Sequence, residues 1–184
     1  MKRLFDVVSS ILLIFFLLPV LFLTALFIFV EDGLPIFFVQ KRFGFLGDSF
    51  YMYKYRSMHN KNMFNQSYFT ISNDPRITKV GKWIRKLSID ELPQLFNVLK
   101  GDMSLVGPRP DVPEQRSQYS DEDWSLRCSV KPGITGLAQV QLRSEGTEEQ
   151  RLNLDLWYTK HRSMFLDLKI IYLTIKRISG QGGN

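Results

Sequence analysis

The sequence predicts an α/β fold that is mostly helical with a small sheet and is attached to a membrane by one kinked helix. The first observation is an uncharged, apolar run of 24 residues from Val7 to Val30. The second is an aromatic-rich stretch, residues 50–58, that reads as a strand. The third is a series of helical patterns in the remaining residues, which suffice for one compact domain of about 150 residues.

The apolar run is long enough to cross a membrane. A straight helix of 24 residues measures roughly 36 Å at about 1.5 Å per residue, against a hydrocarbon core of about 30 Å. A cleavable signal peptide is the alternative, but the run is too long for one and no small-x-small cleavage site follows it. We therefore expect residues 1–36 to form a membrane-inserted helix.

Pro19 lies in the middle of this run and leaves two models of the helix open. Proline removes the hydrogen bond to the Phe15 carbonyl and clashes with that turn, so a kink is expected. Membranes tolerate proline in spanning helices, which on general grounds favours a kinked spanning helix. Basic flanks on both sides, at residues 2–3 and 41–42, mildly favour a re-entrant helix whose two ends share the cytoplasmic side.

The predicted strand at residues 50–58 carries two cations, Lys54 and Arg56. Side chains alternate between the two faces of a strand, so both cations share a face and could bind one anionic ligand. A solvated strand face is the plainer interpretation.

The segment Ser88-Ile89-Asp90-Glu91 has the pattern of a capping box, in which serine and glutamate satisfy unpaired amides of the first helical turn. We therefore expect a helix to begin near Ile89 and to end at Gly101, which suits a left-handed C-terminal cap. Apolar residues follow with the spacing of one buried helical face, at Leu92, Leu95, Phe96 and Leu99.

Two adjacent carboxylates, Asp90 and Glu91, lie in that expected first turn. Free amides and the helix macrodipole favour negative charge there, which predicts a lowered pKa for Asp90. An ionised Asp90 could act as a nucleophile. The plainer interpretation is that Glu91 only closes the capping box and Asp90 only complements the dipole, and the local residues leave both open.

Arg109 stands between Pro108 and Pro110, so its backbone is stiff. A planar guanidinium held in this way suits bidentate binding of phosphate oxygens. A rigid turn with a solvated arginine is the alternative.

The rest of the chain predicts a short helix around residues 121–127, a turn at residues 132–136, and two longer helices. The first of these, residues 148–160, carries Asp155, and the second spans residues 165–178. The amphipathic pattern of the second fits either a bilayer interface or a soluble core. We expect a domain at residues 37–179 and a disordered tail at residues 180–184.

The composition of the chain limits the classes of partner that it is expected to bind. The chain has 24 Lys and Arg against 18 Asp and Glu, with a pI near 9.5, which suits an anionic membrane surface or phosphorylated substrates. No nucleic-acid-binding motif is present, so we expect no nucleic acid partner.

A single cysteine, Cys128, excludes an internal disulfide, and the two histidines have no zinc-type spacing. Any metal is expected to be a hard ion bound to carboxylates and phosphates, which indicates magnesium.

Taken together, these stretches resemble the small monotopic phosphoglycosyl transferases, the bacterial sugar transferase family that starts glycan assembly on a polyprenyl phosphate carrier. The resemblance covers nearly the whole chain. It rests on ordered motifs: Lys2-Arg3-x-Phe5-Asp6 before a proline-broken helix, Gln40-x-Arg42-x-Gly44, Lys54-Tyr55-Arg56-Ser57-Met58, Asp74-x-Arg76-x-Thr78, Asp90-Glu91-Leu92-Pro93-Gln94, Gly107-Pro108-Arg109-Pro110, Pro132-Gly133-Ile134-Thr135-Gly136 and Asp155-x-x-Tyr158.

The resemblance implies a two-step phosphoryl transfer from a UDP-sugar to undecaprenyl phosphate. Asp90 would be the nucleophile, with Glu91 assisting, and UMP would leave. Magnesium would be held partly by Asp90. Arg109 would bind the nucleotide or phosphate end, and the expected helpers in substrate binding are Lys54, Arg56 and Asp155.

The resemblance also implies a re-entrant helix in the bacterial inner membrane, interfacial amphipathic helices, and a catalytic domain that faces the cytoplasm. Downstream glycosyltransferases are expected as partners. The family often has serine before the kink proline, where this chain has Leu18, so the freed carbonyls need another partner, such as Ser10, Thr24 or water. Two other functions stay open: a catalytically silent, membrane-anchored scaffold of a glycan-assembly complex, and an inverting glycosyltransferase that would release UDP. No motif reports which sugar is transferred.

Overall fold

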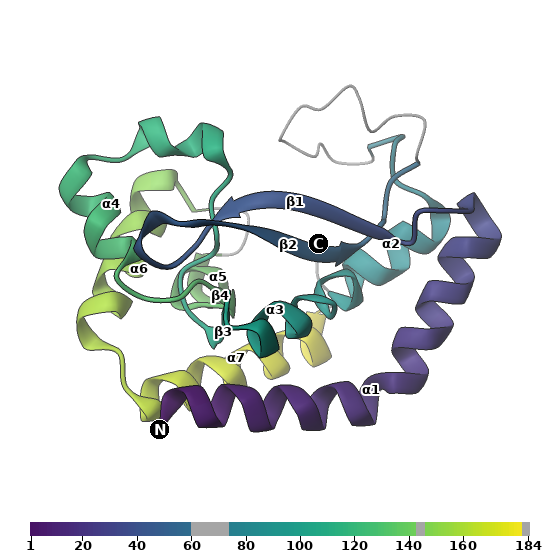
Figure 1. Cartoon of the computed structure of the whole chain (residues 1–184), viewed down its shortest axis with the longest axis horizontal. Helices are drawn as coiled ribbons and strands as arrows, with labels where there is room; N and C mark the ends of the chain where they lie inside the picture. Colours follow the sequence, from purple (N-terminus) through teal and green to yellow (C-terminus); the bar gives the residue numbers. More distant parts are fainter. Residues whose placement is uncertain (60–73, 143–145, 182–184) are drawn as a thin grey trace.

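The computed structural model describes residues 1–59, 74–142 and 146–181 (Figure 1). The α-helices are α1 (Lys2–Asp32), α2 (Lys79–Lys86), α3 (Gln94–Lys100), α4 (Asp121–Cys128), α5 (Leu137–Leu142), α6 (Glu148–His161) and α7 (Met164–Gln181). The strands are β1 (Phe37–Phe43), β2 (Ser49–Tyr55), β3 (Ser104–Val106) and β4 (Gly133–Thr135), in two two-stranded sheets. The prediction of a mostly helical fold with a small sheet content is confirmed.

Helix α1 is bent near its middle, where Pro19 interrupts the hydrogen-bond ladder, as predicted (Figure 1). In the described part of the chain it is the one helix long and apolar enough to cross a membrane, and only 11% of its most apolar window is buried. Near the bend, the Tyr55 hydroxyl donates to the Leu21 carbonyl at 2.8 Å, a contact that the sequence did not predict. A membrane anchor is compatible with this long, outward-facing apolar surface.

The first turns of α1 are bound to the domain by buried polar contacts. Lys2 Nζ lies 2.5 Å from the Asp167 carboxylate of α7 and 3.0 Å from the Val106 carbonyl of β3. The buried Asp6 carboxylate accepts hydrogen bonds from the Ser104 hydroxyl and the Leu105 amide of β3, at 2.9 and 3.2 Å. The charged residues that precede the apolar run therefore join α1 to β3 and α7.

The last turn of α1 is bound to the same domain. The Glu31 carboxylate accepts from the backbone amides of Lys79 and Val80, at 2.8 and 2.9 Å, and so caps the first turn of α2. Arg56 donates to the carbonyls of Asp32 and Gly33, each at 2.9 Å. Both ends of the bent helix are thus attached to one body, with α2 and α3 inside the angle of its two halves (Figure 1).

Strands β1 and β2 form an antiparallel hairpin in which Phe37 pairs with Tyr55 and Phe43 with Ser49. The predicted strand is confirmed, although it ends at Tyr55. The fully buried Asn97 of α3 connects the hairpin to that helix: its side chain accepts from the Tyr53 amide at 3.0 Å and donates to the Tyr51 carbonyl at 2.7 Å. This amide satisfies backbone groups on the edge of β2 that faces away from β1.

The predicted turn at residues 132–136 is wrong, because Gly133–Thr135 forms β4, parallel to β3. The Ser104 amide donates to the Pro132 carbonyl and the Gly107 amide to the Thr135 carbonyl, at 2.8 and 2.9 Å. A Cβ on Gly133 would lie 2.1 Å from the Gly107 nitrogen, so the two backbones need glycine in order to approach. The glycines that suggested a turn are required for this strand contact.

The predicted helix start at Ile89 is also wrong. Ser88 has the left-handed φ of 56° and makes no side-chain cap, whereas a capping residue needs an extended backbone. Residues Ile89–Glu91 form a short 3₁₀ turn between α2 and α3, and α3 begins only at Gln94. The end at Gly101 is confirmed, with a φ of 100°.

The three later helices are confirmed with small changes at their ends. Helix α7 continues through Gln181, past the predicted end at residue 178 and into the predicted tail, whose residues 182–184 lie outside the described part. Its fully buried Ile170 packs in the main core, whose buried members are Met52, Leu95, Val98, Met103, Leu105, Val106, Leu137, Tyr158 and Ile170. Large apolar side chains on α7 remain exposed instead: Phe165, Leu168, Tyr172 and Ile175.

Candidate active site

Three segments that are distant in sequence meet at the 3₁₀ turn Ile89–Glu91. Lys54 reaches it from β2, with its Nζ 2.7 Å from Glu91 Oε1. Arg109, from the loop after β3, places Nη2 3.0 Å from the same oxygen. The predicted residues Lys54, Glu91 and Arg109 therefore form one cluster, and Asp90 is the chain neighbour of its central carboxylate.

Glu91 is held in its charged form. Burial opposes its charge, but the neighbouring Arg109 and Lys54 outweigh burial and lower the pKa of Glu91 to about 2. Burial lowers the pKa of Lys54, while Glu91 raises the pKa of Arg109. Glu91 thus orients two cations before any ligand arrives.

Asp90 has the opposite electrostatic environment. Burial first and the charge of Glu91 second raise its pKa to about 6, against the smaller opposing effects of Lys54, Arg85 and Arg109. The predicted lowering of this pKa is wrong, because burial and a like charge outweigh the cations around a turn that does not begin an α-helix. Among the described residues, none donates a hydrogen bond to the Asp90 carboxylate, which leaves its oxygens available to a ligand.

The structure places two other predicted site residues elsewhere. Arg56 is only 2% exposed and binds the carbonyls at the end of α1, with an ion pair to Asp32 at 3.2 Å. It therefore supports the anchor helix rather than joining Lys54 at Glu91, because β2 ends at Tyr55 and the strand alternation stops there. Asp155 is buried on α6, where its carboxylate lies 3.0 Å from Nε of Arg127.

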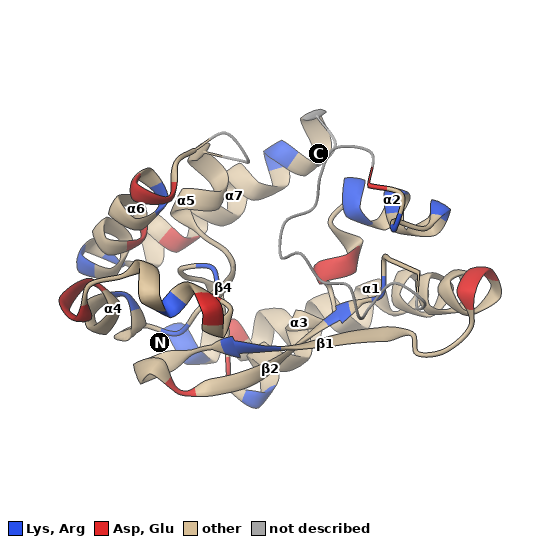
Figure 2. Ribbon diagram, turned by 90° about the horizontal axis from the view of Figure 1, so that it is seen from above, with Lys and Arg blue, Asp and Glu red and all other residues tan. Residues whose placement is uncertain are grey.

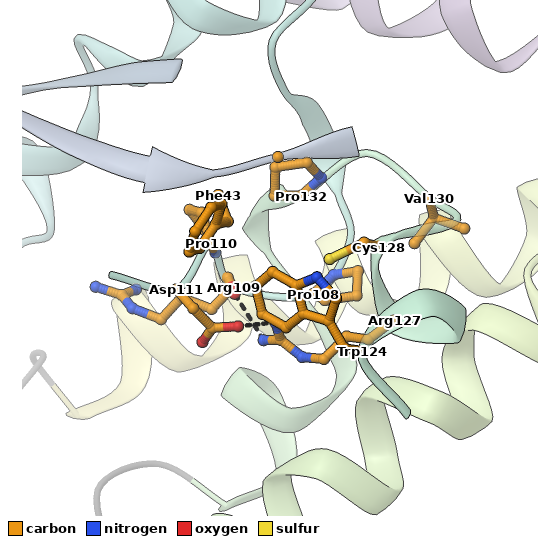
Figure 3. A pocket seen from close by; sticks show the side chains of 11 residues that line it. Phe43, Pro108, Arg109, Pro110, Asp111, Trp124, Arg127, Cys128, Val130 and Pro132 are labelled. Atoms are coloured by element: carbon orange, nitrogen blue, oxygen red, sulfur yellow. Dashed lines mark hydrogen bonds and ion pairs between the residues drawn. The ribbon is translucent and has the colours of Figure 1, made fainter. Parts of the chain in front are cut away.

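Arg127 connects Asp155 to the Arg109 loop, and Figure 3 shows it beside Arg109 and Asp111. Its Nη2 donates to the Arg109 carbonyl at 2.7 Å, and its Nη1 forms an ion pair with Asp111. Its side chain and those of Asp111 and Asp155 are each less than one-tenth exposed. Asp155 thus acts on Arg109 through Arg127, which was missed because its local sequence resembles that of a solvated arginine on a polar helix.

A magnesium ion is compatible with this donor set. The described residues contain no group of three or more His, Cys, Asp or Glu side chains that could hold a metal ion. Magnesium, however, commonly binds one or two carboxylates and completes its shell with ligand phosphates and water. Asp90 fits the role of such a carboxylate, since Glu91 is already paired with two cations.

These features describe a protein with a long apolar N-terminal helix compatible with a membrane anchor, and with a cluster of carboxylates and cations at the turn between α2 and α3. The chain belongs to the bacterial sugar transferase family, whose model matches residues 1–181.

Three relatives illustrate the membership. The chain is 46% identical to an undecaprenyl-phosphate glucose phosphotransferase of Komagataeibacter xylinus, over 96% of this chain and 35% of that protein. It is 40% identical to an undecaprenyl-phosphate galactose phosphotransferase of Salmonella typhimurium, over 100% of this chain and 41% of that protein. It is 43% identical to the uncharacterized sugar transferase EpsL of Bacillus subtilis, over 97% of this chain and 87% of that protein. The chain thus spans less than half the length of the first two relatives and most of EpsL.

Proposed function

We propose that the chain transfers a sugar 1-phosphate from a UDP-sugar to undecaprenyl phosphate and releases UMP. The observation that carries the proposal is Asp90, a carboxylate without a hydrogen-bond donor among the described residues, with a pKa of about 6, next to a carboxylate held by two cations. The names of the phosphotransferases from Komagataeibacter and Salmonella support this reaction class.

In the first step the ionised Asp90 attacks the phosphorus that bears the sugar. A new bond forms between a carboxylate oxygen and phosphorus, and the bond to the bridging oxygen breaks, so that UMP leaves with the electron pair. A pKa near 6 keeps Asp90 mostly ionised at pH 7, because the carboxylate form dominates above the pKa. Lys54 and Arg109, already oriented by Glu91, stabilise the negative charge that develops on the phosphate of the leaving UMP.

In the second step a phosphate oxygen of undecaprenyl phosphate attacks the same phosphorus. The bond between Asp90 and phosphorus breaks, the carboxylate is restored, and the lipid-linked diphosphosugar is formed. This product would be the substrate for further sugar addition by downstream glycosyltransferases. Magnesium bound by Asp90 and the donor phosphates would supply neutralising charge.

We further propose that α1 is re-entrant, with the catalytic domain on the cytoplasmic face of the inner membrane. The support is that Asp6 at one end and Glu31 at the other bind the same domain, so both ends lie on one side of any bilayer. Exposed apolar side chains on α7 and Trp83 of α2 suit the interface beside it. Single cysteines placed on each side of the run should both label from the cytoplasmic side; labelling from opposite sides would restore the spanning model.

The reaction is tested with purified protein, undecaprenyl phosphate and a panel of UDP-sugars, with UMP as the product measured. Asp90→Asn should abolish UMP release, and mass spectrometry without acceptor should find a phosphosugar adduct on Asp90 of the unmodified chain. Release of UDP instead would indicate the inverting glycosyltransferase. Full biological function of the Asp90→Asn chain without turnover would indicate the scaffold.

A further inference from the structure

An apolar groove of about 510 Å³ lies between the second half of α1 and α2. Leu23 and Phe27 of α1 line it on one side, Val80 and Trp83 of α2 line it on the other, and Ile89 of the following turn also lines it. Neither the Asp90 chemistry nor the core of the fold uses this space. The groove has the size of an ordinary small-molecule site, which falls between about 300 and 1,000 Å³.

The position of the groove connects the apolar surface of α1 to the reactive carboxylate. Both walls belong to helices that expose large apolar side chains: Leu23 is 48% exposed and Trp83 is 69% exposed. Ile89 directly precedes Asp90 in the 3₁₀ turn. A chain lying in the groove would therefore begin among exposed apolar side chains and reach the turn that carries Asp90, although Asp90 itself does not line the groove.

Charge at the groove identifies the ligand as an amphiphile with an anionic head. Lys79 lines the groove itself, and basic residues recur along α2 (Figure 2). Arg85 of α2 is close enough to act electrostatically on Asp90. A neutral lipid would make no use of these cations, whereas a phosphate between α2 and the Asp90 turn would pair with them.

We infer that this groove binds the phosphate-proximal isoprene units of the acceptor lipid, with the acceptor phosphate directed past Ile89 toward Asp90. The inference rests on the proposed function. A groove of this size holds only the first part of a long polyprenyl chain, and the remainder lies in the bilayer. The donor sugar nucleotide would instead bind at Lys54 and Arg109, neither of which lines the groove.

The test compares two tryptophan substitutions on the same half of α1. Leu23→Trp fills the groove, while Leu26→Trp, at a residue of similar exposure (43%) that does not line it, is the matched control. Overfilling an apolar site weakens binding by about tenfold or more, so Leu23→Trp should raise the KM for undecaprenyl phosphate by at least that factor. Adduct formation from the UDP-sugar alone should stay unchanged in both variants. An equal KM in both variants would overturn the inference.

A second measurement does not depend on turnover. A fifteen-carbon isoprenyl phosphate that carries a diazirine in its first unit is irradiated with the protein in nanodiscs, with and without excess undecaprenyl phosphate. Competed labelling should fall on residues 20–27 and 79–84; competed labelling on α7 instead would overturn the inference. Competed groove labelling in a protein that forms no adduct and releases no UMP would support the lipid site while rejecting the proposed transfer.

Discussion

Replacing Arg127 by leucine should destabilise the fold by several kcal/mol. The substitution leaves the carboxylates of Asp111 and Asp155 buried without their shared cation and removes the donor to the Arg109 carbonyl. Breaking a buried ion pair by removing one partner costs about 3–5 kcal/mol, which is a large share of the roughly 5–15 kcal/mol that stabilise a typical domain. The assay is urea unfolding in detergent, with tryptophan fluorescence as the readout.

The stability lost in the Arg127→Leu variant should decrease as the pH is lowered. Burial already raises the pKa of Asp155 to about 6, even with Arg127 opposing it, so the variant raises that pKa further. A carboxylate whose pKa is higher in the folded state than in the unfolded state stabilises the fold at low pH. That contribution to stability is lost as the pH rises through the pKa of the folded state. The difference in stability between variant and parent should therefore be smaller at pH 5 than at pH 7.

Arg116→Leu is the control for this prediction, because the partner of Arg116, the Asp121 carboxylate, is almost fully exposed. Exposed pairs contribute about 0–1 kcal/mol, so this variant should unfold close to the parent. If the stability of Arg127→Leu lies within about 1 kcal/mol of the parent at pH 7, the buried network does not stabilise the Arg109 loop.

Four further predictions concern the site and its supports. The kcat/KM for the UDP-sugar should fall about tenfold per pH unit below pH 6 as Asp90 gains its proton, measured by UMP release. Glu91→Gln removes the second largest cause of that raised pKa, so the acidic limb of its residual activity should move to lower pH; an unmoved limb would assign it to another group. Asn97→Ala removes hydrogen bonds to Tyr53 and Tyr51 and should cost about 2–3 kcal/mol in urea unfolding, whereas a loss below about 0.5 kcal/mol would mean that water replaces the amide. Tyr55→Phe removes the donor to the Leu21 carbonyl and should cost about 1 kcal/mol in the same assay, and an unchanged midpoint would refute its support of the bend.

Features with a strong local cause could be predicted from the sequence. The bend at Pro19 follows from the missing amide, the end of α3 at Gly101 from the left-handed backbone, and the strand at β2 from its aromatic, alternating residues. The grouping of Lys54, Glu91 and Arg109 was expected from the resemblance, since local patterns could not bring together three segments so distant in sequence.

The errors have a common physical cause, which is tertiary contact overriding a local pattern. Ser88 has the sequence of a cap, but in the connection between α2 and α3 its backbone is left-handed, which a capping residue does not adopt. Gly133 has the sequence of a turn, but β3 needs a partner strand at close approach. The pKa of Asp90 depends on burial, and the role of Arg127 depends on contacts between α4, α6 and the Arg109 loop; neither is encoded in neighbouring residues.

The attachment of α1 at both ends makes the anchor an integral part of the fold. A passive tether could be cut away, but here α1 supplies the acceptor for the amide of Leu105 and the cap for the first turn of α2. Deleting residues 1–36 would leave those buried donors unsatisfied and uncover apolar surface, so the shortened domain would not be an independent, water-soluble unit. The N-terminal helix is therefore a structural member of the domain, whose β3 and α2 it holds in place through backbone groups that no other described residue satisfies.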